Sequence, residues 1–331
     1  MTSRYKKGIS IVIMAHERQE ETLRAVDAIL NVNFGCETKV TVSDNASSLQ
    51  DTIKGLPSTI VHKVRNPPGD SLWHMNQILQ ELEYEWTLLT HDDDEILPRL
   101  GELFQKYSNI PDVVMITGKS RILVNQVETP DQGYLDRLEQ SSLLNSEPVE
   151  RTDLFDCLFD TGPLFPASAM VVRSEHLSSR AIINPDFDLA GDLAFSMAIA
   201  KNAKVVFDGS SDVMNYHIHG ENSVFSTRAA GGLMADFTTV RLSEAVRHRI
   251  EITRTRHRKL LRSILVARIL AKAFHLDKRY SNVKSYTIAF NKTFPESRIS
   301  KIVLLPVPLG PLKIVVRRLM WKKLGVNRWG Y

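Results

Sequence analysis

An apolar stretch near the start of the chain is the feature that most limits its fold. Residues 9–15, "ISIVIMA", are apolar at nearly every position, so a strand formed there must be covered on both faces. A helical pattern follows at 20–32, with Leu23, Val26 and Leu30 expected on its buried side. Further strand patterns at 39–43, 59–64 and 85–90 alternate with a second helical pattern at 71–83. This rhythm predicts an α/β fold with a doubly wound, mostly parallel, Rossmann-like sheet that binds ligands at the carboxyl ends of its strands.

The rest of the chain continues this pattern and then changes character. A helix is expected after Pro98, and later strands and helices are expected at 112–118, 168–173, 191–202, 204–207 and 213–220. The polar connection at 125–151 shows no clear periodicity, which is typical of a functional or mobile loop. Beyond Gly232 the pattern is helical and basic. We therefore predict one α/β domain at 1–230 and a helical C-terminal extension at 231–331.

Charge is divided unevenly between these two parts. Residues 241–331 hold 22 Lys and Arg against 4 Asp and Glu, a net charge of +18, which leaves −14 for the preceding residues. At 257–276, apolar residues are expected on one helical side and basic residues on the other: Leu261, Ile264, Leu265, Ile269 and Phe274 against Arg258, Arg262, Arg268 and Lys272. The stretch 312–325 interleaves Trp321 with further Lys and Arg. Such a region either packs on the first domain or lies on an anionic membrane surface; nucleic-acid binding is a lesser alternative and is not expected.

Cysteine and apolar content bear on the compartment. The two cysteines, Cys36 and Cys157, give no disulfide framework and suit a reducing cytoplasm. The longest apolar run, 302–312, contains three prolines and is shorter than the roughly 20 residues that cross a bilayer. We expect a cytoplasmic protein with no transmembrane helix.

The segment "LLTHDDDEILP", 88–98, concentrates negative charge after an apolar strand. Asp92, Asp93 and Asp94 are adjacent, and Glu95 follows; side by side, these carboxylates repel one another unless a cation lies among them. The spacing does not match a calcium loop, whose ligands are spread over a dozen residues. It suits Mn²⁺ or Mg²⁺ shared with a diphosphate, and a solvated acidic turn is the alternative.

Five segments together resemble the family 2 glycosyltransferases, which are inverting enzymes of GT-A fold. They occur in the family's order and at about its spacing over residues 9–226: "ISIVIMAHERQEETLRAVDAIL", "VTVSDNASS", "LLTHDDDEILP", "AGDLAF" and "YHIHGENS". The resemblance implies a nucleotide-sugar donor, a UDP-sugar foremost, a divalent metal on the acidic motif, and direct displacement at the anomeric carbon.

The resemblance also implies metal ligands. Asp92 and Asp93 match the motif pair, with Asp93 as the direct ligand, and Asp94 is a further ligand or a supporting carboxylate. His219 matches a histidine that completes the metal shell or touches the diphosphate. His217 lies two residues earlier on the same strand face, so either of the two could be the one that points inward. This chain has His91 where many relatives have Asp.

Donor-binding residues are implied at other strand ends. Asp44 and Asn45 occupy the place of a base-reading segment, although either could simply form an Asx turn. His16 and Glu17 replace a Tyr-Asn pair, and an imidazole can still stack on a base. The remaining donor-binding candidates are Met14, Arg65 and Asn76, and a solvated loop arginine is the alternative for Arg65.

Asp192 is implied to be the catalytic base that deprotonates the acceptor hydroxyl. It follows Gly191 at an expected helix start, where an Asp could equally serve as a cap; Asp188 is a weaker candidate. The chain is thus expected to be a metal-dependent glycosyltransferase, peripheral on the inner face of the cell membrane, acting on a glycan acceptor, lipid-linked, in surface-polysaccharide biosynthesis. The alternatives are a non-catalytic glycan-binding or scaffold protein on the same fold and a nucleic-acid-binding protein.

Overall fold

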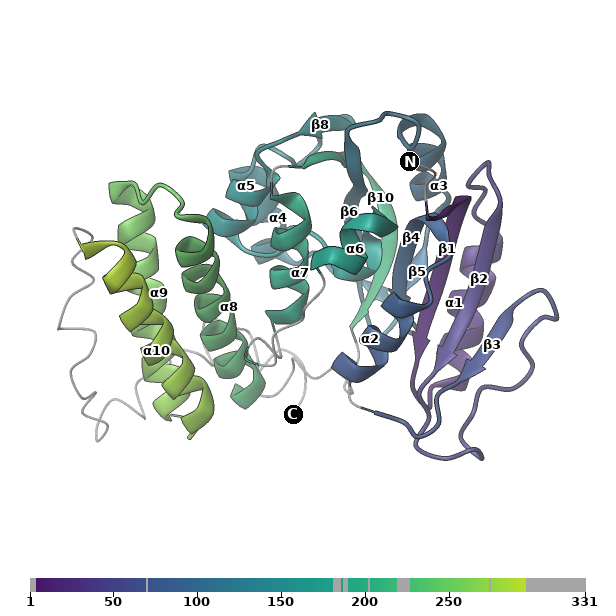
Figure 1. Ribbon diagram of the computed structural model, residues 1–331, viewed down its shortest axis with the longest axis horizontal. Helices are drawn as coiled ribbons and strands as arrows, with labels where there is room; N and C mark the ends of the chain where they lie inside the picture. The colour runs from purple at the N-terminus through teal and green to yellow at the C-terminus, as the bar shows by residue number, and fades with distance from the viewer. Residues whose placement is uncertain are drawn as a thin grey trace. The chain divides into compact units, whose positions relative to one another are not determined.

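The computed structural model describes residues 4–69, 71–180, 186, 190–201, 203–218, 227–273 and 275–295. The chain divides into two compact units, drawn in Figure 1. The first comprises Met1–Ile183 and Phe195–His219, and the second comprises Asn184–Ala194 and Gly220–Tyr331. Helix α8, Thr227–His248, runs through the boundary expected near residue 230.

A mixed, mostly parallel sheet forms the centre of the first unit, as predicted. Its strand order is β3-β2-β1-β4-β9-β6-β10-β5, with β7 paired to β6 and β8 to β10. Neighbours among β1 to β4 are parallel, as are β6 and β10, while β9 lies antiparallel between β4 and β6. The strands are β1 Lys6–Ala15, β2 Thr38–Asp44, β3 Val61–Val64, β4 Tyr84–His91, β5 Glu95–Ile96, β6 Val113–Val124, β7 Val127–Glu128, β8 Val149–Arg151, β9 Val171–Arg173 and β10 Lys204–Ile218.

Helices cover both faces of this sheet. Ile9, Ile11 and Ile13 of β1 belong to the core that also holds residues of α1 and α3, while Ser10 and Val12 line a cavity on the other face with a residue of α2. This alternation explains why β1 is apolar throughout. The helices up to residue 200 are α1 Gln19–Leu30, α2 Ser71–Gln80, α3 Pro98–Tyr107, α4 Gln132–Gln140, α5 Leu154–Thr161, α6 Ser174–Arg180 and α7 Gly191–Ala200, with a 3₁₀ turn at Ala167–Ala169. The first residues of α7, up to Ala194, belong to the second unit.

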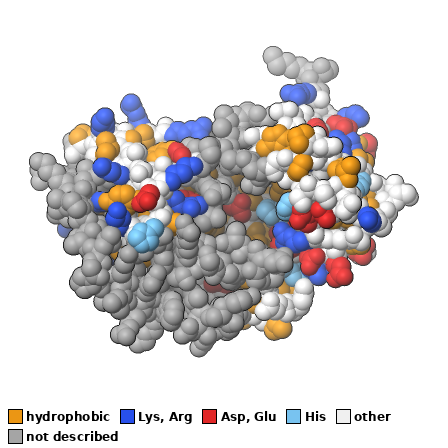
Figure 2. Space-filling view, turned by 90° about the horizontal axis from the view of Figure 1, so that it is seen from below, with side chains coloured by type: hydrophobic (Ala, Val, Ile, Leu, Met, Phe, Trp, Pro, Cys, Tyr) orange, Lys and Arg blue, Asp and Glu red, His pale blue; other side chains and the backbone are white. Residues whose placement is uncertain are grey.

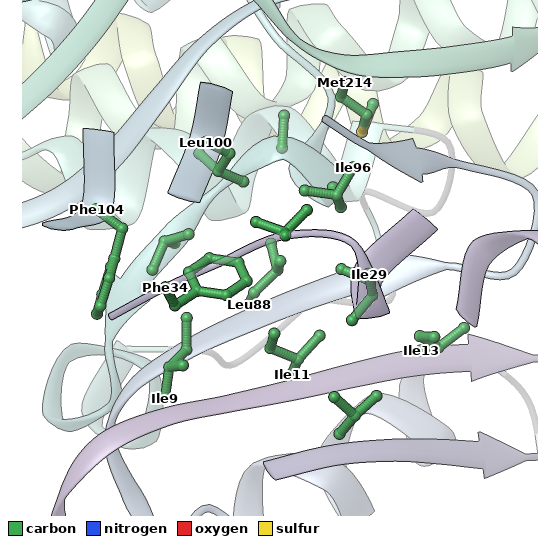
Figure 3. Close-up of a cluster of buried hydrophobic side chains, with 14 of the residues drawn as sticks. Ile9, Ile11, Ile13, Ile29, Phe34, Leu88, Ile96, Leu100, Phe104 and Met214 are labelled. Carbon is green, nitrogen blue, oxygen red and sulfur yellow. The ribbon is translucent and has the colours of Figure 1, made fainter. Parts of the chain in front are cut away.

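The core between the sheet and helices α1 and α3 holds β1 against β4. Figure 3 shows Ile11 of β1, Leu88 of β4 and Leu100 of α3 pointing into this layer, and all three are fully buried. Phe104 packs edge-on against Phe34 and Trp86, with ring centroids 5.6 Å apart in both pairs. Burying each such side chain stabilises the fold by roughly 1.5–3 kcal/mol, so the ends of β1 and β4 have fixed positions.

Three sequence-based expectations were wrong in detail. The buried side of α1 carries Thr22, Ala25, Val26 and Ile29, whereas Leu30 is 47% exposed; it follows Ile29 and is therefore turned about 100° from it around the helix. The polar connection at 125–151 contains α4, β7 and β8. The two expected late strands are one strand, β10, whose pairing with β6 shifts register between Asp208 and Met214.

The described part of the second unit consists mainly of α8, α9 (Arg254–Ala273) and α10 (Asp277–Thr293). The basic face expected on α9 is wrong at Arg268, which is only 1% exposed and donates from Nη2 to the Tyr280 hydroxyl at 2.8 Å. Leu265, which was expected on the apolar side of this helix, is 45% exposed beside Val266. Phe274 and the stretch 312–325 lie outside the described residues. None of the described helices has the length and apolar character needed to span a bilayer.

Candidate active site

The carboxyl ends of three parallel strands meet at one edge of the sheet. Ala15, the last residue of β1, is opposite Asp44 of β2, and Met14 is opposite both Ser43 of β2 and His91 of β4. Met14 is half-buried at this point. The loops that follow these strands, which carry most of the predicted site residues, therefore begin side by side at this edge of the sheet.

His16 links two of these strand ends. Its backbone N–H donates to Asp92 Oδ2 at 2.9 Å, and its Nδ1 lies 2.6 Å from the Asn45 carbonyl oxygen. The Asn45 N–H in turn donates to the Ala15 carbonyl at 2.9 Å. His16 itself is exposed. The structure thus brings His16, Asn45 and Asp92 together, and their role in donor binding stays a prediction.

Arg18 supplies the positive charge among the carboxylates, and the sequence analysis missed it. Its Nη2 lies 3.2 Å from Asp92 Oδ1, and its Nη1 lies 2.5 Å from Asp93 Oδ2. Both carboxylates are buried, with residue exposures of 1% and 6%. Burial lowers the pKa of Arg18, but Asp92 and Asp93 raise it above its usual value. Burial also disfavours the charged form of Asp92 and so raises its pKa, whereas the charge of Arg18 acts to lower it.

Asp94 and Glu95 belong to a neighbouring network with β10. Burial, with the repulsion of Asp93, raises the pKa of Asp94 to about 7, and its Oδ1 accepts from the His217 N–H at 3.4 Å. Glu95 Oε1 lies 2.8 Å from Arg24 Nε and 3.2 Å from His217 Nε2. The His217 ring therefore lies against Glu95, and burial lowers its pKa. His219 lies outside the described residues.

The Asp92–Asp93 pair has the chemistry of a divalent-metal site. One oxygen of each carboxylate converges on a single cationic group, and Mg²⁺ commonly uses only one or two protein carboxylates, completing its shell with phosphate and water. Among the residues that the structure describes, no group of three or more His, Cys, Asp or Glu is placed to hold a metal ion. The donor set fits such an ion in kind, and Arg18 contacts the same oxygens.

Asp44 and Asn45 both hold loops in place. Asp44 has no exposed surface, and its Oδ2 accepts from the Ile53 N–H at 2.8 Å and lies 2.9 Å from His62 Nε2. The Asn45 side chain donates to the Gly69 carbonyl at 2.8 Å and accepts from the Gly69 N–H at 3.0 Å. Asp44 also accepts from the N–H two residues on, which is the Asx-turn contact. These residues fix the loops beside His16.

Arg65 and Asn76 lie in different surroundings. Arg65 is buried: its Nε donates to Ser43 Oγ at 2.8 Å, and its two Nη atoms donate to Glu81 at 2.8 and 2.9 Å. The alternative of a solvated loop arginine was therefore wrong, and hydrogen bonds from Arg65 lower the pKa of Glu81 to about 2. Asn76 is exposed on α2.

Asp192 lies in the first turn of α7, which begins at Gly191 as predicted. It is exposed and belongs to the segment Asn184–Ala194 of the second unit. Asp188 lies outside the described residues. The position of Asp192 suits either a carboxylate that stabilises the helix end or a catalytic base, so its catalytic role stays a prediction.

Comparison with known proteins identifies similar structures. No family model matches the chain, and no curated protein matches its sequence. The structure of S. aureus TarS 1–349 in complex with UDP-GlcNAc is similar, with a TM-score of 0.50 and 12% identity over 87% of this chain and 92% of that one. Another crystal structure of S. aureus TarS has a TM-score of 0.50 and 14% identity over 85% of this chain and 55% of that one. The mannosyltransferase PcManGT of Pyrobaculum calidifontis, in complex with GDP-Man and Mn²⁺, has a TM-score of 0.48 and 13% identity over 98% of this chain and 83% of that one.

These likenesses concern the fold. The sequence identities to TarS are too low to indicate more than the fold. The TarS structures show that the first unit has the expected GT-A-like α/β architecture, with a mostly parallel central sheet. The expected fold class is confirmed. Substrate and chemistry have to be argued from this chain's own residues.

A pH-dependent loss of stability is expected from His74, which lies behind the strand ends. His74 is 6% exposed, with Nε2 2.7 Å from the Ser43 hydroxyl. Burial, then Arg65, lowers its pKa to about 4. Because the folded pKa lies below the ordinary value near 6.5, the stabilisation is complete above pH ~6.5 and is lost as pH falls towards 4.

Wild type should therefore lose up to about 3 kcal/mol more unfolding free energy than His74→Gln between pH 7 and pH 4. Urea denaturation of both proteins at each pH measures the difference. Equal losses in the two proteins would show that His74 does not carry this dependence.

Proposed function

We propose that the chain transfers a sugar from a nucleotide-sugar donor, a UDP-sugar foremost, to a hydroxyl of a glycan acceptor with inversion at the anomeric carbon. The observation that carries this proposal is the convergence of His16, Asn45 and the Asp92–Asp93 pair at one sheet edge. Open α/β sheets bind their ligands at this edge. The shared fold with TarS, solved with UDP-GlcNAc, supports the choice of donor class.

The two sides of the site suit the two ends of such a donor. The exposed imidazole of His16, beside the loops that Asp44 and Asn45 hold, offers a surface on which a base can stack. Asp92 and Asp93 would hold Mn²⁺ or Mg²⁺, with Asp94 and His219 as further candidates. When bound, this ion would neutralise charge on the leaving diphosphate. Met14 and Asn76 are proposed to line the donor cleft, whereas Arg65 contributes by holding Ser43 in β2.

Asp192 is the proposed general base. Its carboxylate would take the proton of the acceptor hydroxyl as that oxygen attacks the anomeric carbon and the bond to the diphosphate breaks. A positioned base typically contributes ~10²–10⁴-fold in rate. Its exposure on α7 is compatible with direct access by an acceptor.

The second unit is proposed to lie on the cytoplasmic, inner face of an anionic membrane, where a lipid-linked acceptor for surface-polysaccharide biosynthesis would be found. On α9, the exposed Leu265 and Val266 follow the exposed Arg258, Lys259 and Arg262. Figure 2 shows Lys and Arg side chains interleaved with hydrophobic ones on the described helices of this unit. Apolar and basic side chains together suit an anionic lipid surface.

A second candidate is a non-catalytic glycan-binding protein on the same fold. Two observations favour it: Asp44 is fully enclosed, and Arg18 already contacts Asp92 and Asp93. Slow hydrolysis of the donor without acceptor would exclude this candidate, since it requires an active site that handles the sugar–phosphate bond.

Nucleoside diphosphates should stabilise the protein when Mn²⁺ is present. Ligand at 100 times its Kd raises the unfolding free energy by about 2.7 kcal/mol, which a thermal-shift screen of UDP, GDP and other diphosphates would detect. Asp93→Asn should lose the Mn²⁺-dependent part. Asp153→Asn, which removes an exposed carboxylate paired with Arg151, is the control and should keep it. A screen without any shift would reject the donor site.

Asp192→Asn should lower turnover by at least ~10²-fold while leaving the nucleotide-induced shift nearly unchanged, because it removes a proton acceptor and no donor contact. Asp277→Asn is the matched control, since Asp277 is also an exposed acid in the first turn of a helix of the second unit. Parallel losses of donor affinity and turnover would make Asp192 a binding residue instead.

Reversing charge on α9 should release the protein from anionic vesicles. We expect Arg258→Glu, Lys259→Glu and Arg262→Glu together to abolish sedimentation with phosphatidylserine vesicles, because each basic residue near the surface contributes about 1 kcal/mol. The control reverses three exposed lysines of the first unit: Lys7, Lys54 and Lys106. Equal loss in both triple variants would show that net charge, not α9, governs binding.

A further inference from the structure

We propose that Arg18 is an internal counter-cation of the Asp92–Asp93 pair, and that Arg18 and a divalent metal ion occupy this pair in alternation. The proposal rests on contacts within the first unit and does not depend on the identity of the donor or on sugar transfer. It gives a role to a residue that none of the sequence motifs singled out.

The two cations would compete for the same atoms. Arg18 Nη2 and Nη1 contact Asp92 Oδ1 and Asp93 Oδ2, one oxygen from each carboxylate. The second oxygen of Asp92 accepts from the His16 N–H. A guanidinium forks across two oxygens much as a metal ion bridges them. A metal ion can take both converging oxygens only after Arg18 has left them.

The surroundings allow Arg18 to leave by moving its side chain alone. Its backbone carbonyl accepts from the Thr22 N–H at 3.0 Å and from the Thr22 hydroxyl at 2.6 Å, which holds the main chain at the start of α1. Its side chain is 29% exposed, so the guanidinium has a route to water. The exchange therefore needs rotation about side-chain bonds and no movement of β1 or α1.

Burial explains why one of the two cations is needed. Asp92, Asp93 and Asp94 are adjacent and each is at most 6% exposed, so water screens their repulsion poorly. Arg24, a second arginine close to this loop, is paired with Glu95. With Arg18 in place, the acidic loop stays organised without metal, and an entering ion has to replace a favourable contact. Metal affinity in the absence of nucleotide should therefore be weak.

Titration with Mn²⁺ alone, without nucleotide, tests the exchange. Calorimetry or the spin-resonance signal of free Mn²⁺ gives the Kd, and melting in chelator and in Mn²⁺ gives the stability. Arg18→Gln should melt lower than wild type in chelator, bind Mn²⁺ about tenfold tighter or more, and recover most of its lost stability in Mn²⁺. Arg18→Lys should be intermediate, because a single ammonium lacks the two-nitrogen fork.

Arg99→Gln is the matched control. Arg99 Nε lies 2.7 Å from the fully buried Asp208 in the same unit, so this variant also leaves a buried carboxylate without its arginine. It should be destabilised but keep the Mn²⁺ affinity of wild type and gain no recovery in Mn²⁺.

Two results would overturn the proposal. One is an Arg18→Gln protein that binds Mn²⁺ no tighter than wild type; if that variant does not fold, the same result for Arg18→Lys decides. The other is equal recovery of Arg18→Gln and Arg99→Gln in Mn²⁺. Since no nucleotide is present, failure of the proposed sugar transfer would leave these measurements unchanged.

Discussion

The parallel pairing of β1 with both β2 and β4 is the constraint on which the candidate site depends. It places the residue after each strand at one edge, so that the His16 N–H reaches Asp92 and the His16 ring reaches the Asn45 carbonyl. The register is held by a core in which the inward residues of β1 are fully buried. A slip of one residue would turn every one of these side chains to the opposite face, so core packing and site geometry are one requirement.

The second constraint is that buried carboxylates need a partner of opposite charge. In each unit an arginine supplies this charge. In the first unit, Arg18 lies between Asp92 and Asp93. In the second, Asp236, 1% exposed, accepts from Arg279 Nε at 3.1 Å. A buried carboxylate without a cation or hydrogen bonds loses far more in hydration than folding returns. The side chains of the two arginines are similarly exposed, 29% for Arg18 and 24% for Arg279, but Arg18 precedes α1 at the end of a loop, whereas Arg279 lies within α10.

The local pattern of apolar residues predicted the helices and strands, which depend on burial. It did not predict side-chain contacts between residues that are far apart in the sequence. The strand at 9–15, the helix start at Gly191 and the mostly parallel sheet followed from apolar runs and their spacing. Arg18 was missed because its partners are over seventy positions away, although unbalanced acids at 92–94 did predict some cation. Arg268 was misplaced because helical spacing cannot reveal that the half-buried Tyr280 accepts a hydrogen bond from its guanidinium. The late strands were split because "DGSSD" reads as a turn, whereas Gly209 packs against the Leu143 carbonyl.

The acidic residues of the site serve the fold before they serve any chemistry. Asp44 binds the N–H groups of Ala46 and Ile53, Asp92 that of His16, and Asp94 that of His217. Each bond ties a loop to a strand end, so the loops are ordered before a ligand arrives and little ordering entropy remains to be lost on binding. Asp93 is tied by the Arg18 side chain, a contact that can be exchanged without releasing a loop. The Arg18–Asp93 contact joins two side chains, so it can change while the hydrogen bonds of Asp92 and Asp94 to backbone N–H groups stay in place.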